Sequence, residues 1–146
     1  EHRVYHHSSY TNSRIAAAGV GKGTSRTIYR GDIVVDKGTV RTEGKQEGRF
    51  LVLDPNAKID AVPALDVAAH DVVSAHALSV GYLSPKMLFY PRLRGLRAED
   101  AVGFLVSGMM KQTLARGGAP ERDAYEMSRI GESLSGVLPR GHATYE

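Results

Sequence analysis

The sequence contains no cysteine among its 146 residues. Structural disulfides, thiolate zinc sites, iron–sulfur ligation by cysteine and cysteine nucleophiles are therefore excluded within this chain. A lack of disulfides is typical of cytosolic proteins, so we expect a cytoplasmic location.

Long apolar runs and concentrated positive charge are also missing. No apolar segment approaches the roughly 18 to 20 residues that a membrane-spanning helix needs, and no signal-peptide pattern opens the chain. The net charge is only +3, and no basic block or arginine stripe with interleaved aromatics is present. We therefore expect neither a membrane nor a nucleic-acid partner. Because the chain begins without an initiator methionine, we expect a piece of a longer protein.

The chain has an ordinary globular composition, with 42% hydrophobic and 24% charged residues. Short apolar segments and tight turns fill its first 83 residues. The segment Arg26–Val35 alternates like a strand around Gly31, where a bulge or a close backbone approach is expected. Residues 36–48 form a polar, turn-rich stretch, and residues 50–53 form a short strand. Strands of about three to six residues with no helix between them predict a β-sandwich, a barrel or a parallel β-helix. Continuous Val, Ile and Leu pieces without Asn-Gly hairpin signals favour the β-helix.

The pattern changes after Leu83. Ser84 is a good N-cap and Pro85 suits the first helical position, which predicts a short helix over 85–90, stopped by Pro91. A second helix is predicted over Ala98–Arg116, ending at Gly117, and a third over 121–134. We therefore expect a β core over 1–83, followed by a small helical domain over 84–146.

Histidines and acids near the end of the β part are the main candidates for chemistry. His70 and His76 are an even number of residues apart on one strand, and Asp66 or Asp60 would complete a metal site. A lyase or hydrolase site built from His76, Asp71 and Asp66 is a second interpretation. The third is that His76 is a structural residue facing inward in a packed strand, and that the chain is a plain β-helix interaction module without cluster chemistry.

Two further motifs give weaker evidence of a functional site. The pair His6-His7 is expected to lie on the surface of the terminus. "GVGKGTS" lacks the spacing of a phosphate-binding loop and a following helix, which excludes a nucleotide site there.

Aromatic and methionine side chains crowd the two predicted helices. Aromatics, Met and Arg together are typical of a protein interface, but they would equally seal the open end of the β core. The residues concerned are Phe89, Tyr90, Phe104, Met109 and Met110.

The segment "HDVVSAHALSVGYLSPKMLFYPRLRGLRAEDAVGFLVSGM" closely resembles the C-terminal part of the SufB/SufD family of iron–sulfur cluster assembly proteins. "YRGDIVVDKG" and "LVLDPNAKIDAVPALDV" are also similar to strands of this family. The resemblance implies a right-handed parallel β-helix core followed by a helical domain. It further implies a non-enzymatic component of the SUF assembly complex.

The resemblance also implies two protein partners. The helical region would dock an ABC-type ATPase, SufC, and the last strands would pair with a second SufB/SufD-like subunit, either a paralogue or a second copy. His76 corresponds to the family's interface histidine. The ATPase segment covers 88–96 and continues into the helix over 98–113. Its candidate contact residues are Leu88, Phe89, Tyr90, Arg92, Arg94 and Gly95.

This sequence departs from the family at positions that matter for cluster chemistry. Ser74 stands where SufD-type members commonly have Cys, and Ala77 stands where SufB-type members have an acid. Without a thiolate, no cluster is expected to bind stably to this chain alone. A cluster would be held only transiently at a subunit interface, with Ser74 and His76 as this chain's candidates. This favours a SufD-like, partner-organising role.

Overall fold

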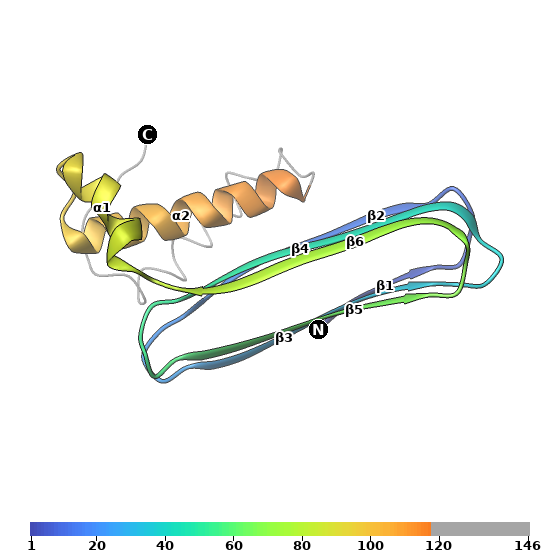
Figure 1. Ribbon diagram of the computed structural model, residues 1–146, viewed down its shortest axis with the longest axis horizontal. Helices are drawn as coiled ribbons and strands as arrows, with labels where there is room; N and C mark the ends of the chain where they lie inside the picture. Colours follow the sequence, from blue (N-terminus) through green and yellow to red (C-terminus); the bar gives the residue numbers. More distant parts are fainter. Residues whose placement is uncertain (118–146) are drawn as a thin grey trace. The chain divides into compact units, whose positions relative to one another are not determined.

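Six strands and two helices make up the computed structural model, which describes residues 1–117. Strands β1, β3 and β5 form one parallel sheet, called sheet A, and β2, β4 and β6 form another, called sheet B (Figure 1). Consecutive strands therefore lie in opposite sheets. In chain order the strands are β1 (His2–His6), β2 (Asn12–Gly21), β3 (Arg26–Val35), β4 (Val40–Val52), β5 (Lys58–Val67) and β6 (Asp71–Tyr82).

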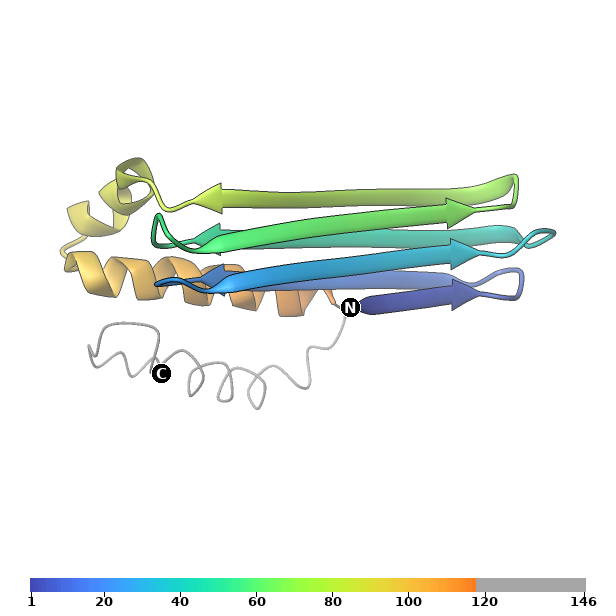
Figure 2. The same ribbon diagram turned by 90° about the horizontal axis from the view of Figure 1, so that it is seen from below.

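The predicted right-handed parallel β-helix is wrong. Over the described residues, the chain forms two separate three-stranded sheets and two helices, a small α/β arrangement, with no closed or coiled β-helix (Figure 2). The prediction depended on strands of three to six residues, but β2 to β6 have ten to thirteen residues each. Strands of this length pair in register within their own sheet, where neighbouring strands satisfy each other's backbone hydrogen bonds.

Strand β4 occupies most of the stretch that the sequence predicts to be polar and turn-rich. Its side chains alternate, and those facing the interior are polar or absent at Thr42, Gly44, Gln46 and Gly48. Parallel pairing with β2, from Asn12↔Glu43 to Gly21↔Val52, holds the strand. The prediction of a polar, turn-rich stretch over 36–48 is therefore wrong for most of its length. It failed because a strand with a polar interior face shows no apolar alternation in the sequence.

The interior lies between the two sheets and contains two apolar clusters. Tyr29 of sheet A and Phe50 of sheet B meet with ring centroids 5.1 Å apart. One cluster consists of Tyr29, Phe50, Val52, Ala57 and Ile59. The other consists of Ile15, Ile33 and Val35.

The described chain divides into two compact units, Glu1–Gly81 and a second that starts at Tyr82. The second contains α1 (Pro85–Leu93) and α2 (Ala98–Arg116). The predicted third helix, over 121–134, lies outside the described residues, so a helical domain over 84–146 stays a prediction. Neither α1 nor α2 is long and apolar enough to span a bilayer.

The predicted bounds of α2 are confirmed, including the cap at Gly117. The prediction that Pro91 stops α1 is wrong, because the helix continues through it to Leu93. Pro91 cannot donate a hydrogen bond to the preceding turn. Its own carbonyl nevertheless accepts bonds from the N–H groups of Arg94 and Leu96, at 3.1 and 3.2 Å, and these close the helix.

Candidate functional site

Helix α1 exposes nearly all of its large apolar side chains. Pro85 occupies its first turn and Ser84 precedes it in an extended conformation. Of the nine residues, only Pro91 is buried. Four large side chains are exposed to the following extents: Met87 41%, Phe89 63%, Tyr90 61% and Leu93 68%.

Arginines border this apolar surface. Arg94 Nη2 donates to the hydroxyl of Tyr90 at 2.8 Å, and its guanidinium lies 5.2 Å from the centre of the same ring. These two contacts favour one orientation of the Tyr90 ring. Gly95, with φ of +89°, ends the helix in a conformation that favours glycine. Arg92 is exposed, and Leu88 is half-buried.

Helix α2 begins with an ion pair outside the apolar surface. Arg97 Nε donates to Asp100 Oδ2 at 2.8 Å. This hydrogen bond holds the pKa of the Asp100 carboxyl below its ordinary value. Ala101 and Val106 are buried, whereas Phe104 is 49% exposed. The start of α2 thus combines a fixed charge pair with an exposed aromatic ring.

Strand β6 ends the order β2–β4–β6, so among the described strands only β4 flanks it. Val72, Ser74 and Leu78 share its interior side and are half-buried. His76 lies on this same side by alternation but is exposed, which does not meet the expectation of a packed strand. Further along, Val80 is 43% and Tyr82 66% exposed.

The alternative enzyme residues are not brought together. Asp71 and His76 are five residues apart in β6, so their side chains point to opposite faces of the strand. Asp66 alternates with the buried positions of β5 and so lies on the outer face of sheet A. Within residues 1–117, no group of three or more His, Asp or Glu side chains is placed to hold a metal ion. His70 and Asp60, the other predicted ligands, are exposed.

Sequence reasoning missed the arrangement around His6. The side chain is 3% exposed, so the prediction of a surface residue is wrong. Its ring nitrogens lie 2.7 Å from the hydroxyls of Thr11 and Ser13. The alternation of Val4 and His6 with Tyr5 was the available signal, since Val4 packs against the interior. His7 is exposed as predicted, and its Nδ1 lies 2.6 Å from Asp36 Oδ2.

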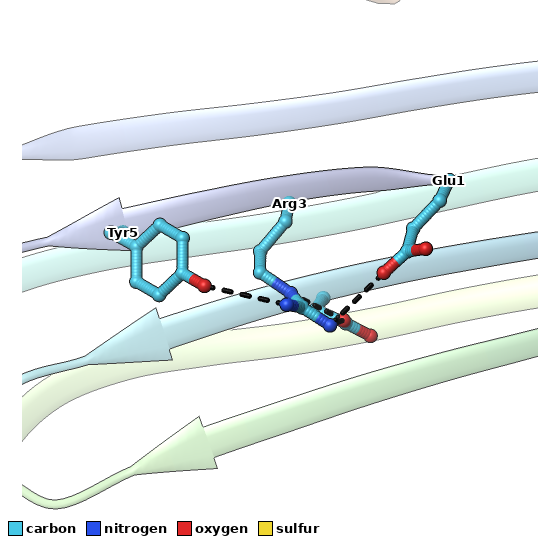
Figure 3. A network of polar contacts seen from close by, with 4 residues as sticks. Glu1, Arg3 and Tyr5 are labelled. Carbon is cyan, nitrogen blue, oxygen red and sulfur yellow. Dashed lines mark hydrogen bonds and ion pairs between the residues drawn. The ribbon is translucent and has the colours of Figure 1, made fainter.

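The outer face of sheet A carries a polar network centred on Arg3 (Figure 3). Arg3 Nε donates to Asp32 Oδ2 at 2.8 Å, and its other nitrogens contact Glu1 at 3.0 Å and the Tyr5 hydroxyl at 3.4 Å. The bond to Asp32 raises the pKa of Arg3 above its ordinary value. These exposed contacts link β1 to β3, and pairs of this kind contribute little to stability.

Comparison with known proteins identifies the class. Residues 1–109 match the SufBD core domain family of the SUF system for FeS cluster assembly. The chain belongs to this family, which confirms the resemblance seen in the sequence.

Individual relatives agree with this assignment. SufD of Bacillus subtilis is 31% identical over 108 residues, which cover 74% of this chain and 25% of the relative. SufD of Escherichia coli is 26% identical over 134 residues, covering 90% and 31%. A SufBD family protein of Mycobacterium leprae is 30% identical over 128 residues, covering 88% and 14%. The chain thus spans a third or less of the length of these relatives.

Proposed function

We propose that this chain is part of a non-enzymatic, cytoplasmic component of the SUF iron–sulfur cluster assembly complex, and that α1 with the start of α2 binds the ATPase SufC. The observation that carries the proposal is the exposure of Met87, Phe89, Tyr90 and Leu93 on one short helix. Contiguous apolar surface of this kind typically marks a protein interface.

The chemistry of α1 also supports an interface. Tyr and Arg are enriched among the residues that dominate binding energy, and aromatic anchors contribute most when they are already ordered. Arg94 already favours one orientation of Tyr90, so less conformational entropy is lost when a partner buries this ring. Arg92 adds a positive charge beside the anchors, which suits a partner with an acidic rim.

A second part of the proposal concerns β6. We infer that a SufB/SufD-like subunit, either a paralogue or a second copy, lies against this strand. Within residues 1–117 one edge of β6 has no neighbouring strand, and such an edge offers backbone donors and acceptors to another chain. His76 would face that subunit. It would contribute an imidazole to a cluster passing through the interface, with the thiolates supplied by the partner.

The test of ATPase binding is co-purification of the full-length protein with the SufC-type ATPase of the same genome. Wild type is compared with the double variant Phe89→Ala/Arg92→Glu. The matched control is Ile28→Ala/Arg30→Glu, which makes the same kinds of change at exposed positions of β3. Loss of the ATPase from the α1 variant alone supports the proposal. Retention of the ATPase by the α1 variant overturns the assignment of α1.

A further inference from the structure

His6 ends β1 with a buried imidazole whose two ring nitrogens both meet hydroxyl groups. Nδ1 lies 2.7 Å from Thr11 Oγ1, and Nε2 lies 2.7 Å from Ser13 Oγ. The side chain is 3% exposed, so these two hydroxyls replace water as its hydrogen-bond partners.

The single hydrogen of the Thr11 hydroxyl determines the direction of these bonds. Thr11 Oγ1 donates to the carbonyl oxygen of Ser8 at 3.0 Å. It must therefore accept its bond from His6, and the proton of the uncharged ring lies on Nδ1. Nε2 is then an acceptor, and Ser13 donates its hydroxyl hydrogen to it. The result is a directed chain from Ser13 through His6 and Thr11 to a backbone carbonyl.

This chain has the arrangement of an activated nucleophile. A hydroxyl bonded to an imidazole nitrogen, with the opposite nitrogen fixed by a third group, is the pattern that makes serine reactive. Ser13 is half-buried. Its neighbour in β4 is Gly44, which has no side chain to compete for the hydroxyl.

We propose that Ser13 is a reactive serine that accepts acyl groups from activated acyl compounds such as thioesters, with His6 as its base and Thr11 as the positioning residue. Ser13 Oγ bonds to the acyl carbon while the carbon–sulfur bond breaks. The hydroxyl proton passes to His6 Nε2 and then to the departing thiolate. None of these residues belongs to α1 or β6, so the proposal is independent of the proposed partner-binding function.

The test uses p-nitrophenyl acetate as the acyl donor and the full-length protein, with acetylated serines located by peptide mass spectrometry. Ser25 is the internal control, because its Oγ accepts from the backbone N–H of Lys22 at 3.0 Å instead of bonding an imidazole. Because a positioned general base accelerates a reaction roughly 100-fold or more, we expect Ser13 to be acetylated about 100-fold faster than Ser25. Equal rates at the two serines overturn the proposal.

Two variants at Thr11 separate reactivity from folding. Thr11→Val keeps the side-chain shape but removes the acceptor for Nδ1–H, and we expect at least about a 10-fold loss in the Ser13 acetylation rate. Thr11→Ser keeps the hydroxyl and should retain the wild-type rate. Thermal melts of both variants show whether the fold is intact. If two folded variants acetylate Ser13 at the same rate, the proposed role of Thr11 is wrong.

Discussion

A Cβ atom at Gly31 of β3 would lie 1.9 Å from Nε2 of Gln46 in β4. The same amide donates to the Tyr29 hydroxyl at 3.2 Å, so the space opposite Gly31 is filled by a buried polar pair. Gln46 is 1% exposed. The two sheets therefore approach each other closely at Gly31, which is one of the two alternatives, a bulge or a close approach, that the sequence leaves open there.

Replacing Gly31 by alanine should destabilise the first unit. The added methyl group forces Gln46 away and breaks its bond to Tyr29, and overpacking of this kind costs about 1–3 kcal/mol. Urea unfolding measures the change. Gly81→Ala is the control, because a Cβ there meets nothing within 4 Å. We expect that variant to stay within about 0.5 kcal/mol of wild type or to gain stability.

The Gly31→Ala loss should depend on Gln46. In a Gln46→Ala variant the methyl group added at position 31 has room. Gly31→Ala should therefore lower the free energy of unfolding less in that variant than it does in wild type. Additive losses in this double-mutant cycle would contradict the contact between the two residues.

Asp100 should make the stability of α2 dependent on pH. Its pKa lies below the ordinary 3.8 because Arg97 donates a hydrogen bond to the carboxylate. Because the folded-state pKa is lowered, the ion pair stabilises the folded state fully above about pH 4. This stabilisation is lost as the pH falls through the lowered pKa. Asp100→Asn should therefore lower helix stability at pH 7 but have a smaller effect near pH 3.

Thermal melts followed by far-ultraviolet circular dichroism test this pH dependence. Glu99→Gln is the matched control, because it removes a neighbouring charge from the same helical turn and leaves the bond from Arg97 to Asp100 intact. An equal difference between wild type and Asp100→Asn at both pH values would show that the ion pair is not the cause.

A charge on the interior side of β6 should weaken association between SufB/SufD-like subunits. Val80 is 43% exposed on the edge strand, and burying an unpaired carboxylate there is costly. We expect Val80→Glu to reduce binding of the second subunit at least about 10-fold, measured by sedimentation of the purified pair. Ile28→Glu, on the outer face of the central strand β3, should leave association unchanged. Equal effects of both variants would argue against β6 as the interface.

Local signals in the sequence are sufficient to predict some of the strands and helices. The alternation in β3 and the acidic start and glycine end of α2 predict both elements with their observed bounds. The extent of β4 is not predictable in this way, because Thr42 and Gln46 face the interior and hide the apolar period. Which sheet each strand joins depends on pairing between distant residues, and this is why the β-helix prediction failed.

Some features of the candidate site were likewise predictable from the sequence and others were not. The aromatics of α1 are evident in the sequence, but their exposure is not, because composition suits an interface and a seal over the β core equally. The family follows from the combined motif over 70–109. His6 was missed because its burial depends on β1 pairing with β3 and on hydroxyls from the start of β2. The exposure of His76 also depends on tertiary structure, since alternation gives the side of a strand but not what covers it.

Titration of the purified full-length protein with its SufC-type ATPase tests the central claim most directly. We expect Phe89→Ala/Arg92→Glu to raise the dissociation constant by at least about 30-fold, because the loss of a hot-spot residue costs about 2 kcal/mol or more of binding free energy. The control Ile28→Ala/Arg30→Glu should bind within about 2-fold of wild type. Equal affinity of wild type and the α1 variant would contradict the account.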